Sequence, residues 1–379
     1  MKKIAICIFA LCFAGNVYAY DLNKIQIHGF ISQGYLQTDN NDFYYAKTED
    51  GTFQFNEMGI NFTTELTEQL RVGVQFLSRD LGELGNNDVD IDWAFADYRY
   101  QNWLGLRAGR IKRPFGFYNR SRDIDAARTF VMLPPMVYDD VERDSVSATI
   151  GIGIYGYLPY GFSYELQYGT MKMDEDGGEA SNAAWLLNTL INNVIVGNCF
   201  SAALEWVTPL EGLTLSGTAY DLTDNVTFET SMGKLDVDAT HYVASAEYTY
   251  DRLTLAAEYR YYPMEFTLND NVKIADQTIE AWYISASYEL TDWFTLGSYY
   301  GEIYSDKDDR DGDKYKARGL PGALAWRKDL ALTTRFDIND YWVFKLEGHM
   351  MNGLAQVTTP PNEADEDWFL FAAKMTFSF

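Results

Sequence analysis

Apolar and polar residues alternate with a period of two along much of this 379-residue chain. The alternation is clearest in the runs 70–76, 146–154, 162–168, 253–261, 342–350 and 369–379. Successive side chains of a β-strand point to opposite faces, so each run predicts a strand with one apolar and one polar face. Charged residues recur on the polar faces, and a filled core would not tolerate so many unpaired buried charges. The pattern therefore predicts strands that have lipid on one face and water on the other.

Short connections between these runs predict hairpin turns, at 67–69, 101–103, 159–161, 209–212, 251–252, 291–293 and 339–340. They alternate with longer loops, which gives sixteen strands near 24–38, 52–66, 70–79, 90–100, 104–112, 146–157, 162–172, 198–207, 213–222, 239–250, 252–263, 278–290, 294–304, 327–338, 342–352 and 367–379. The predicted fold is all-β: a closed sixteen-stranded antiparallel transmembrane β-barrel. Its short turns face the periplasm and its long loops face outward. A barrel of this size leaves room for an aqueous channel.

The composition agrees with a barrel and disfavours several other classes. Mean hydropathy is −0.26, and no stretch beyond the N-terminus has the ~18 apolar residues that a spanning helix needs. Aromatic residues make up 16% of the chain, as expected where rings collect in two interfacial girdles. The formal net charge of −25 argues against nucleic acid as a partner.

The N-terminus predicts export. Lys2 and Lys3 precede the apolar stretch 4–14, and Val17-Tyr18-Ala19 is typical of a cleavage site. We therefore expect a signal peptide at 1–19 and a barrel domain at 20–379. Outside the signal peptide only Cys199 remains, which excludes an intramolecular disulfide and a thiolate metal cluster. No cofactor and no metal site is predicted.

One outer connection, about 113–145, differs from the others. It is long, apolar and aromatic, which suits a loop packed inside the barrel, and loops of this length are usually functional. Basic residues crowd its start and acidic residues its end, and such a field could sort solutes by charge at a constriction. The candidate constriction residues are Arg107, Arg110, Lys112, Arg113, Arg120, Arg122, Arg128, Asp139, Asp140 and Glu142.

Further basic residues fall on polar strand faces and are expected to line the lumen: Arg71, Arg99, Arg260, Arg335, Lys345 and Lys374. Structural roles are an alternative for the loop arginines. Arg110 falls on the lipid-facing phase unless Gly109 marks a bulge, and Arg122 or Arg128 could pin the loop to acids of the wall. The other outer loops are acidic. We expect 305–313 to be solvated, because Lys307 and Arg318 occupy ligand positions of a calcium loop, and we expect a short helix within 182–196.

Two segments resemble known proteins. The final Phe377-Ser378-Phe379 resembles the assembly signal of bacterial outer-membrane barrels. The third-loop motif resembles that of sixteen-stranded Gram-negative porins, especially the family of the phosphate-selective porins O and P. It comprises Gly109, Arg110, Lys112, Pro114, Gly116, Tyr118, Asn119, Arg122, Asp123, Leu133, Pro134 and Tyr138. The lysine-dense loop of a committed phosphate binder is missing.

The resemblance implies a homotrimeric diffusion channel in the outer membrane, with the third loop folded into the lumen. The implied partners are outer-membrane lipid and lipopolysaccharide, the barrel assembly machinery, and small hydrophilic solutes or anions. From the basic residues we expect weak anion preference. An enzyme is disfavoured, because the histidines (His28, His241 and His349) lie on separate predicted strands and no hydrolase motif is present. An adhesin or structural barrel acting through the acidic loops is the remaining alternative.

Overall fold

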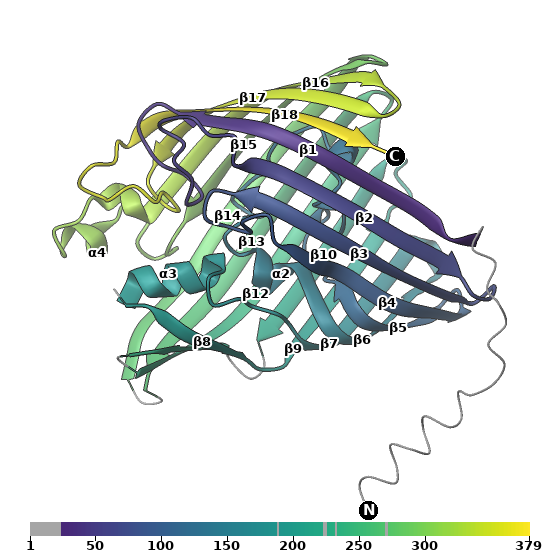
Figure 1. Cartoon of the computed structure of the whole chain (residues 1–379), viewed down its shortest axis with the longest axis horizontal. Coiled ribbons are helices and arrows are strands. Elements are labelled where there is room, and N and C mark those ends of the chain that lie inside the picture. The colour runs from purple at the N-terminus through teal and green to yellow at the C-terminus, as the bar shows by residue number, and fades with distance from the viewer. Residues whose placement is uncertain (1–23, 188, 223–225, 232, 270–271) are drawn as a thin grey trace, which may run out of the picture.

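The computed structural model describes residues 24–187, 189–222, 226–231, 233–269 and 272–379, and these residues form one antiparallel sheet that closes on itself (Figure 1). Closure is made by β1 (Gln26–Thr38), which pairs with β2 (Phe55–Glu65) on one side and β18 (Asp367–Ser378) on the other. Each end of the sheet therefore satisfies the backbone groups of the other, as a structure in lipid requires. The closed barrel is confirmed. The predicted signal peptide lies outside the described residues.

The sheet contains eighteen strand segments that make sixteen barrel strands. The segments β8 and β9 follow one another along a single barrel strand, and so do β10 and β11, because β8 pairs with β11 while β9 pairs with β10. The remaining bounds are β3 (Leu70–Leu81), β4 (Val89–Gln101), β5 (Leu104–Lys112), β6 (Ala148–Tyr157), β7 (Phe162–Thr170), β8 (Ile191–Val196), β9 (Cys199–Val207), β10 (Leu213–Leu222), β11 (Val226–Thr230), β12 (Gly233–Tyr250), β13 (Leu253–Leu268), β14 (Val272–Thr291), β15 (Phe294–Tyr304), β16 (Trp326–Asn339) and β17 (Trp342–Gly353).

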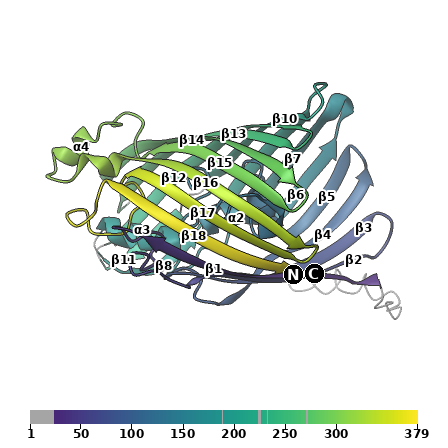
Figure 2. The same cartoon turned by 90° about the horizontal axis from the view of Figure 1, so that it is seen from above.

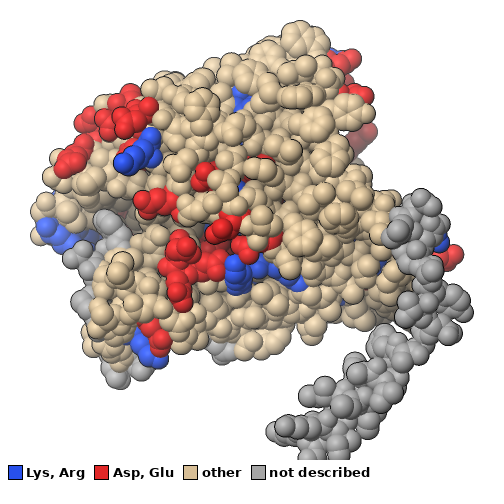
Figure 3. Space-filling view, viewed as in Figure 1, with Lys and Arg blue, Asp and Glu red and all other residues tan. Residues whose placement is uncertain are grey.

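The two predicted faces of the wall are confirmed. On β6, Ile150, Ile152 and Ile154 are exposed outward, while Thr149 is fully buried inward. On β18, Phe369 and Met375 are exposed, whereas Leu370, Ala372 and Lys374 between them alternate to the inside and are buried. Over the strands visible in Figure 3 most side chains are uncharged, and the charged ones gather mainly toward the loop-bearing end.

Loops five and six were predicted too long. The strands β12, β13 and β14 extend beyond the bounds expected for them. Only two residues separate β11 from β12, and only three separate β13 from β14. The reason is an apolar cluster beyond the membrane band that includes Leu235, Val237 and Tyr262. The helix α3 (Gly178–Leu187) packs on this cluster through Ala180 and Ala183. Contacts between the buried side chains of this cluster stabilise the paired strands beyond the membrane band.

The short helix expected within 182–196 covers only the first part of that segment and begins before it. The helix α3 ends at Leu187, and Ile191–Val196 forms β8. That strand gains its partner from β11, a long-range pairing that outweighs local preference. The loop that contains 305–313 is also less solvated than expected, because Asp306 and Asp309 are buried. Asp309 accepts hydrogen bonds from the Lys314 amide at 3.1 Å, at the start of α4 (Asp313–Lys316).

The long loops and the C-terminus lie at opposite ends of the barrel, with α3 and α4 at one end and β18 finishing at the other (Figure 2). The short connection η4 (Pro159–Gly161) lies between β6 and β7, and η5 (Gly322–Ala325) precedes β16. Among the residues described, no helix is both long and apolar enough to cross a membrane. The third loop, 113–147, contains three short helices: η2 (Asn119–Ser121), η3 (Asp125–Ala127) and α2 (Arg143–Ser147).

Candidate functional site

The third loop is folded into the barrel, as predicted, and its first anchor is Arg113. This side chain is fully buried. Its guanidinium donates to Oγ1 of Thr149 at 3.2 Å and stacks 3.7 Å over the ring of Tyr220. A guanidinium that is both stacked and hydrogen-bonded in this way is held rigidly. Arg113 therefore fixes the point at which the chain leaves β5 and turns inward.

The middle of the loop is held to the far wall by two buried carboxylates. Asp125 forms an ion pair with Lys345 at 3.1 Å and accepts a hydrogen bond from Thr376 Oγ1 at 2.7 Å. From the wall, Glu347 accepts the backbone amides of Val131 and Met132 at 2.8 and 3.0 Å. Each carboxylate satisfies groups that would otherwise be buried without partners, so the loop is bound to the wall by charge-assisted hydrogen bonds.

The loop's end is tied to its beginning. Arg122 donates to the backbone oxygens of Tyr138 and Asp139 at 3.0 and 2.7 Å and to the Asp140 carboxylate at 2.9 Å. Burial alone would raise the pKa of Asp140, but Arg122, together with Arg79 and Arg143, outweighs it and lowers that pKa to about 2. Asp140 is therefore ionised at any physiological pH. The basic start and the acidic end of the loop are in direct contact here, rather than facing each other across an open gap.

A cavity of about 310 Å³ lies between the third loop and the wall formed by β2–β5. We call it the loop-three pocket. Its lining comprises Asn61, Arg71, Gln75, Trp93, Phe95, Arg107, Ile111, Lys112, Arg120, Asp123 and Ile124. Four of these residues are basic, and three of the four (Arg107, Lys112 and Arg120) belong to the predicted constriction set, while Arg71 was predicted as lumen wall.

In the loop-three pocket, exposed basic side chains lie in front of buried carboxylates. The side chains of Arg71 and Arg120 are 49% and 51% exposed, whereas their carboxylate partners Asp97 and Glu165 are only 7% and 9% exposed. Arg107 bridges the same two acids, at 3.0 Å from Asp97 and 3.5 Å from Glu165. The acids thus lie in the wall and hold the guanidinium groups toward the water. The charge nearest to the water is therefore positive, although the local charges nearly balance.

Lys112 also pairs with two buried carboxylates. Its Nζ lies 2.6 Å from Asp92 and 2.5 Å from Asp123, both of which are nearly inaccessible. Asp92 reaches the lumen because β4 has a bulge at this position: the pairing with β3 passes from Trp93 to Ile91 and skips Asp92. A bulge places two successive side chains on one side of the sheet. Asp92 and Trp93 therefore both face inward.

The aromatic floor of the pocket was missed by the sequence analysis. Trp93 stacks on Phe95 with ring centroids 5.3 Å apart, and the guanidinium carbons of Arg71 and Arg107 lie 5.4 and 5.3 Å from the Phe95 ring. A signal was present, because Trp93 and Phe95 alternate in phase with the polar Asp97 and opposite small alanines. Rings on that phase point into the water-filled side of the barrel.

The other candidate residues take structural positions. Arg110 is half-buried and donates from Nε to the Asp92 backbone oxygen at 3.0 Å. The bulge considered at Gly109 is absent from the pairing of β5, which is continuous there, and lies instead on the neighbouring β4. Gly109 itself has φ +128°, and an added Cβ would lie 2.1 Å from the Ala94 oxygen, so only glycine fits. Arg128 pairs with Asp125 at 3.4 Å.

Acids at the loop's end and several wall residues also pair internally. Asp139 accepts the amide of Val141 at 2.9 Å, and Glu142 forms an ion pair with the fully buried Arg260 at 2.5 Å.

On the wall, Lys374 is buried against Glu57 at 2.6 Å, and Arg335 donates to the Arg128 oxygen at 2.8 Å. Arg99 is exposed near the far end of β4. Lys345 and Lys374 thus lie beneath the loop, while Arg71 and Arg99 face open space.

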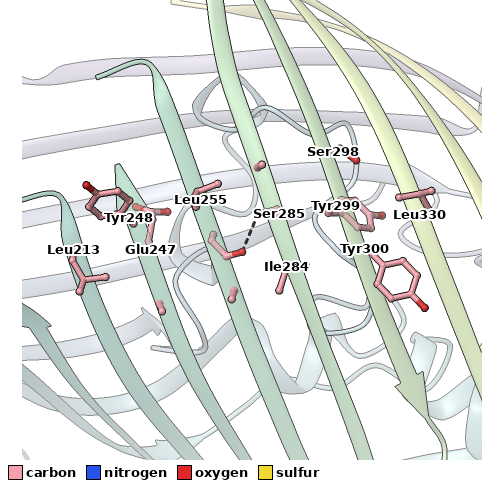
Figure 4. Close-up of a pocket in the computed structure, with 14 residues that line it drawn as sticks. Leu213, Glu247, Tyr248, Leu255, Ile284, Ser285, Ser298, Tyr299, Tyr300 and Leu330 are labelled. Atoms are coloured by element: carbon pink, nitrogen blue, oxygen red, sulfur yellow. Dashed lines mark hydrogen bonds between the residues drawn. The ribbon is translucent and has the colours of Figure 1, made fainter. Parts of the chain in front are cut away.

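A larger cavity, of about 530 Å³, is a different kind of feature. It lies along β12–β16, and its rim includes Leu255, Ile284 and Leu330, which are on the outward, lipid-facing phase (Figure 4). An apolar trough on that surface suits lipid rather than hydrated solutes. In the described part of the chain, no cluster of three or more acidic, histidine or cysteine side chains could hold a metal ion.

A closed sixteen-stranded barrel with a charged lumen, narrowed by an inward loop, defines the class of diffusion channels of the bacterial outer membrane. The chain belongs to the Gram-negative porin family, whose model matches residues 5–319. It is thus an integral outer-membrane protein that forms a channel for passive diffusion, and the prediction that it is not an enzyme is confirmed by the family.

Solved structures agree with the fold. The anion-selective porin of Comamonas acidovorans superposes with a TM-score of 0.60 at 13% identity, over 94% of this chain and 99% of that one. OmpF of Salmonella typhi, in complex with daunomycin, gives 0.60 at 15% identity over 94% and 97%. The trimer form of OmpT from Vibrio cholerae gives 0.58 at 13% identity over 94% and 99%. No curated protein matched the chain in sequence.

Proposed function

We propose that the channel passes small hydrophilic solutes with a weak preference for anions, and that Arg71, Arg107, Lys112 and Arg120 are the residues that solutes meet. The observation that carries this proposal is the layering of charge in the loop-three pocket, with bases toward water and their acids set into the wall. The preference is weak because each base is partly compensated by a carboxylate close behind it. The remaining candidates, among them Arg113, Arg122 and Arg128, keep the loop in place.

The test is charge reversal in the pocket. We expect the double variant Arg71→Glu, Arg120→Glu to move the reversal potential in a KCl gradient toward cation selectivity, because both side chains are about half-exposed in the loop-three pocket. The matched control is Asp308→Asn, Asp313→Asn in the seventh loop, whose carboxylates are 72% and 82% exposed. Salt screens such exposed charges within a Debye length of ~8–10 Å, so the control should change little at 0.1 M KCl. A larger shift in the control would place selectivity elsewhere.

We also propose that the chain assembles as a homotrimer in contact with lipopolysaccharide, after recognition of Phe377 and Phe379 by the barrel assembly machinery. The trimer form of OmpT supports the oligomeric state by analogy of fold. The Phe379 backbone exchanges two 3.0 Å hydrogen bonds with Gly29 of β1, so the proposed signal lies where the barrel closes. The kinship with the phosphate-selective porins O and P is proposed for the third-loop segment, without a lysine-dense phosphate site.

The trimer has a direct test. Because the described sheet has no free edge, detergent has little to unravel, and we expect unheated protein in SDS to migrate as an oligomer. Boiling should convert it to a single unfolded chain, lighter than the 43.3 kDa of the whole sequence because the signal peptide is removed. Native mass spectrometry in mild detergent should give three chains. Unheated protein that migrates as a folded single chain would overturn the trimer and leave the barrel intact, whereas identical migration with and without heating would contradict the closed barrel.

A further inference from the structure

The loop-three pocket combines flat aromatic rings with guanidinium groups, a pairing that simple charge selection does not need. We propose that it is a binding subsite for small aromatic carboxylates, in which the ring lies on Trp93 and Phe95 and the carboxylate meets Arg71, Arg107 or Arg120. This inference rests on the proposed anion-preferring channel and specifies the solute that the channel retains longest.

The rings form a continuous floor because the neighbouring wall positions are glycine. Phe95 pairs with Gly73 on one side and with Gly109 on the other. An added Cβ on Gly73 would lie 2.9 Å from Cζ3 of Trp93, so the indole lies close over a position that carries no side chain. No side chain at position 73 or 109 therefore lies beside Phe95, and the Trp93 indole occupies the space over Gly73.

Two aliphatic side chains, one from the third loop and one from the wall, also line the pocket. Ile124 projects from the third loop, 45% exposed, and Ile111 lines the wall beside Lys112. A ring bound on Trp93 would thus be covered from the loop side by an aliphatic side chain. Offset stacking on aromatic rings and contact with an aliphatic group favour a benzene ring, and the volume of about 310 Å³ is enough for one ring with its carboxylate.

The polar groups favour a carboxylate over a sugar. Asn61 donates to Gln75 at 3.2 Å, and Gln75 donates to Asp92 at 2.8 Å, so the two amides are committed to the wall. The groups left facing water are the guanidiniums of Arg71 and Arg120, which match a carboxylate in planar geometry. A guanidinium can also lie against the ring of the bound solute, as Arg71 and Arg107 already do with Phe95.

The probe is sodium benzoate added to the full-length channel in a planar bilayer in KCl. We expect benzoate to reduce the single-channel current in a saturable way, while acetate at the same concentration does not. Trp93→Ala should raise the half-blocking concentration roughly three- to tenfold, the range expected for one aromatic contact. Trp93→Leu, which keeps apolar bulk without a flat ring, should fall between wild type and Trp93→Ala.

Trp206→Ala is the matched control. Trp206 also stacks on a phenylalanine, Phe162, at 5.3 Å, but on the outward phase of β9, and its loss should leave the block unchanged. Trp206→Ala should also keep the KCl reversal potential of the wild type, which verifies an intact channel. The inference is overturned if benzoate and acetate reduce the current alike. It is also overturned if gluconate reduces the current as strongly as benzoate does and Trp93→Ala leaves the half-blocking concentration of benzoate unchanged, which would indicate a site for sugar acids. Both outcomes leave the anion preference standing, whereas a cation-selective wild type would overturn the proposed function itself.

Discussion

Replacement of Glu347 by alanine is expected to release the middle of the third loop from the wall, so that the single-channel current, steady in the wild type, fluctuates between levels. The Glu347 carboxylate accepts the amides of Val131 and Met132, the Thr333 hydroxyl at 2.5 Å and a contact from His349 at 3.1 Å. Each buried amide left without a partner costs about 1–3 kcal/mol. Since about 1.4 kcal/mol corresponds to a factor of ten, the population with a detached segment should rise at least tenfold.

Single-channel recording measures this effect. The variant Glu347→Ala should show frequent transitions between conductance levels that wild type visits rarely. The control is Thr333→Val, which removes one hydrogen bond from the carboxylate but leaves both loop amides bonded, and it should remain close to wild type. A steady current from Glu347→Ala, with unchanged conductance, would mean that other contacts hold the loop and that the amide bonds are dispensable.

The strands could be predicted because one physical constraint applies along the whole wall. Lipid on one side and water on the other require apolar and polar residues to alternate with a period of two. The runs at 70–76, 146–154 and 342–350 accordingly lie within β3, β6 and β17 and have the predicted faces, except that residues 146–147 precede β6. The third loop could be recognised by its length and aromatic content, which are unusual for a solvated loop. The same constraint failed beyond the membrane band, where tertiary packing extended β12–β14.

Partnerships among the charges could not be predicted. Lys345 and Asp125 are 220 residues apart, and Glu347 is more than 200 residues from the amides that it binds. Alternation tells which face a side chain takes but not its height in the lumen or its neighbour across it. For this reason alternation could predict that these basic residues face the interior, whereas only the structure separates those beneath the loop, such as Lys345, from those that face water, such as Arg71.

The junction between the third and fourth loops is expected to loosen as pH rises through 7–8. Glu179 of α3 accepts the Ser145 amide at 3.0 Å, and its other oxygen is buried without a hydrogen-bond partner among the described residues. Burial, and next to it the charge of Asp144, raises the pKa of Glu179 to about 8. Burial, and then the charge of Glu142, raises the pKa of the nearby Asp139 to about 7.

The sign follows from proton linkage. Both acids bind protons more tightly in the folded state than in the unfolded state, where their pKa values are near 4. The stabilisation is therefore complete at low pH and declines as pH rises, with the loss finished above pH 8. The closed junction should be firm at pH 5 and weaker at pH 9, the opposite of the usual behaviour of ion-paired carboxylates such as Asp140.

Cys199 provides the readout, because it is fully buried in the cluster that α3 covers and is the only cysteine outside residues 1–19. We expect thiol labelling of wild type to accelerate from pH 5 to pH 9 by more than labelling of Glu179→Gln, which carries no charge at any pH. Taking the ratio of the two rates at each pH cancels the ionisation of the thiol itself. The exposed Glu175→Gln on the same loop is the control and should follow wild type. A wild-type to Glu179→Gln ratio that stays constant from pH 5 to pH 9 would show that Glu179 does not govern the opening of this junction.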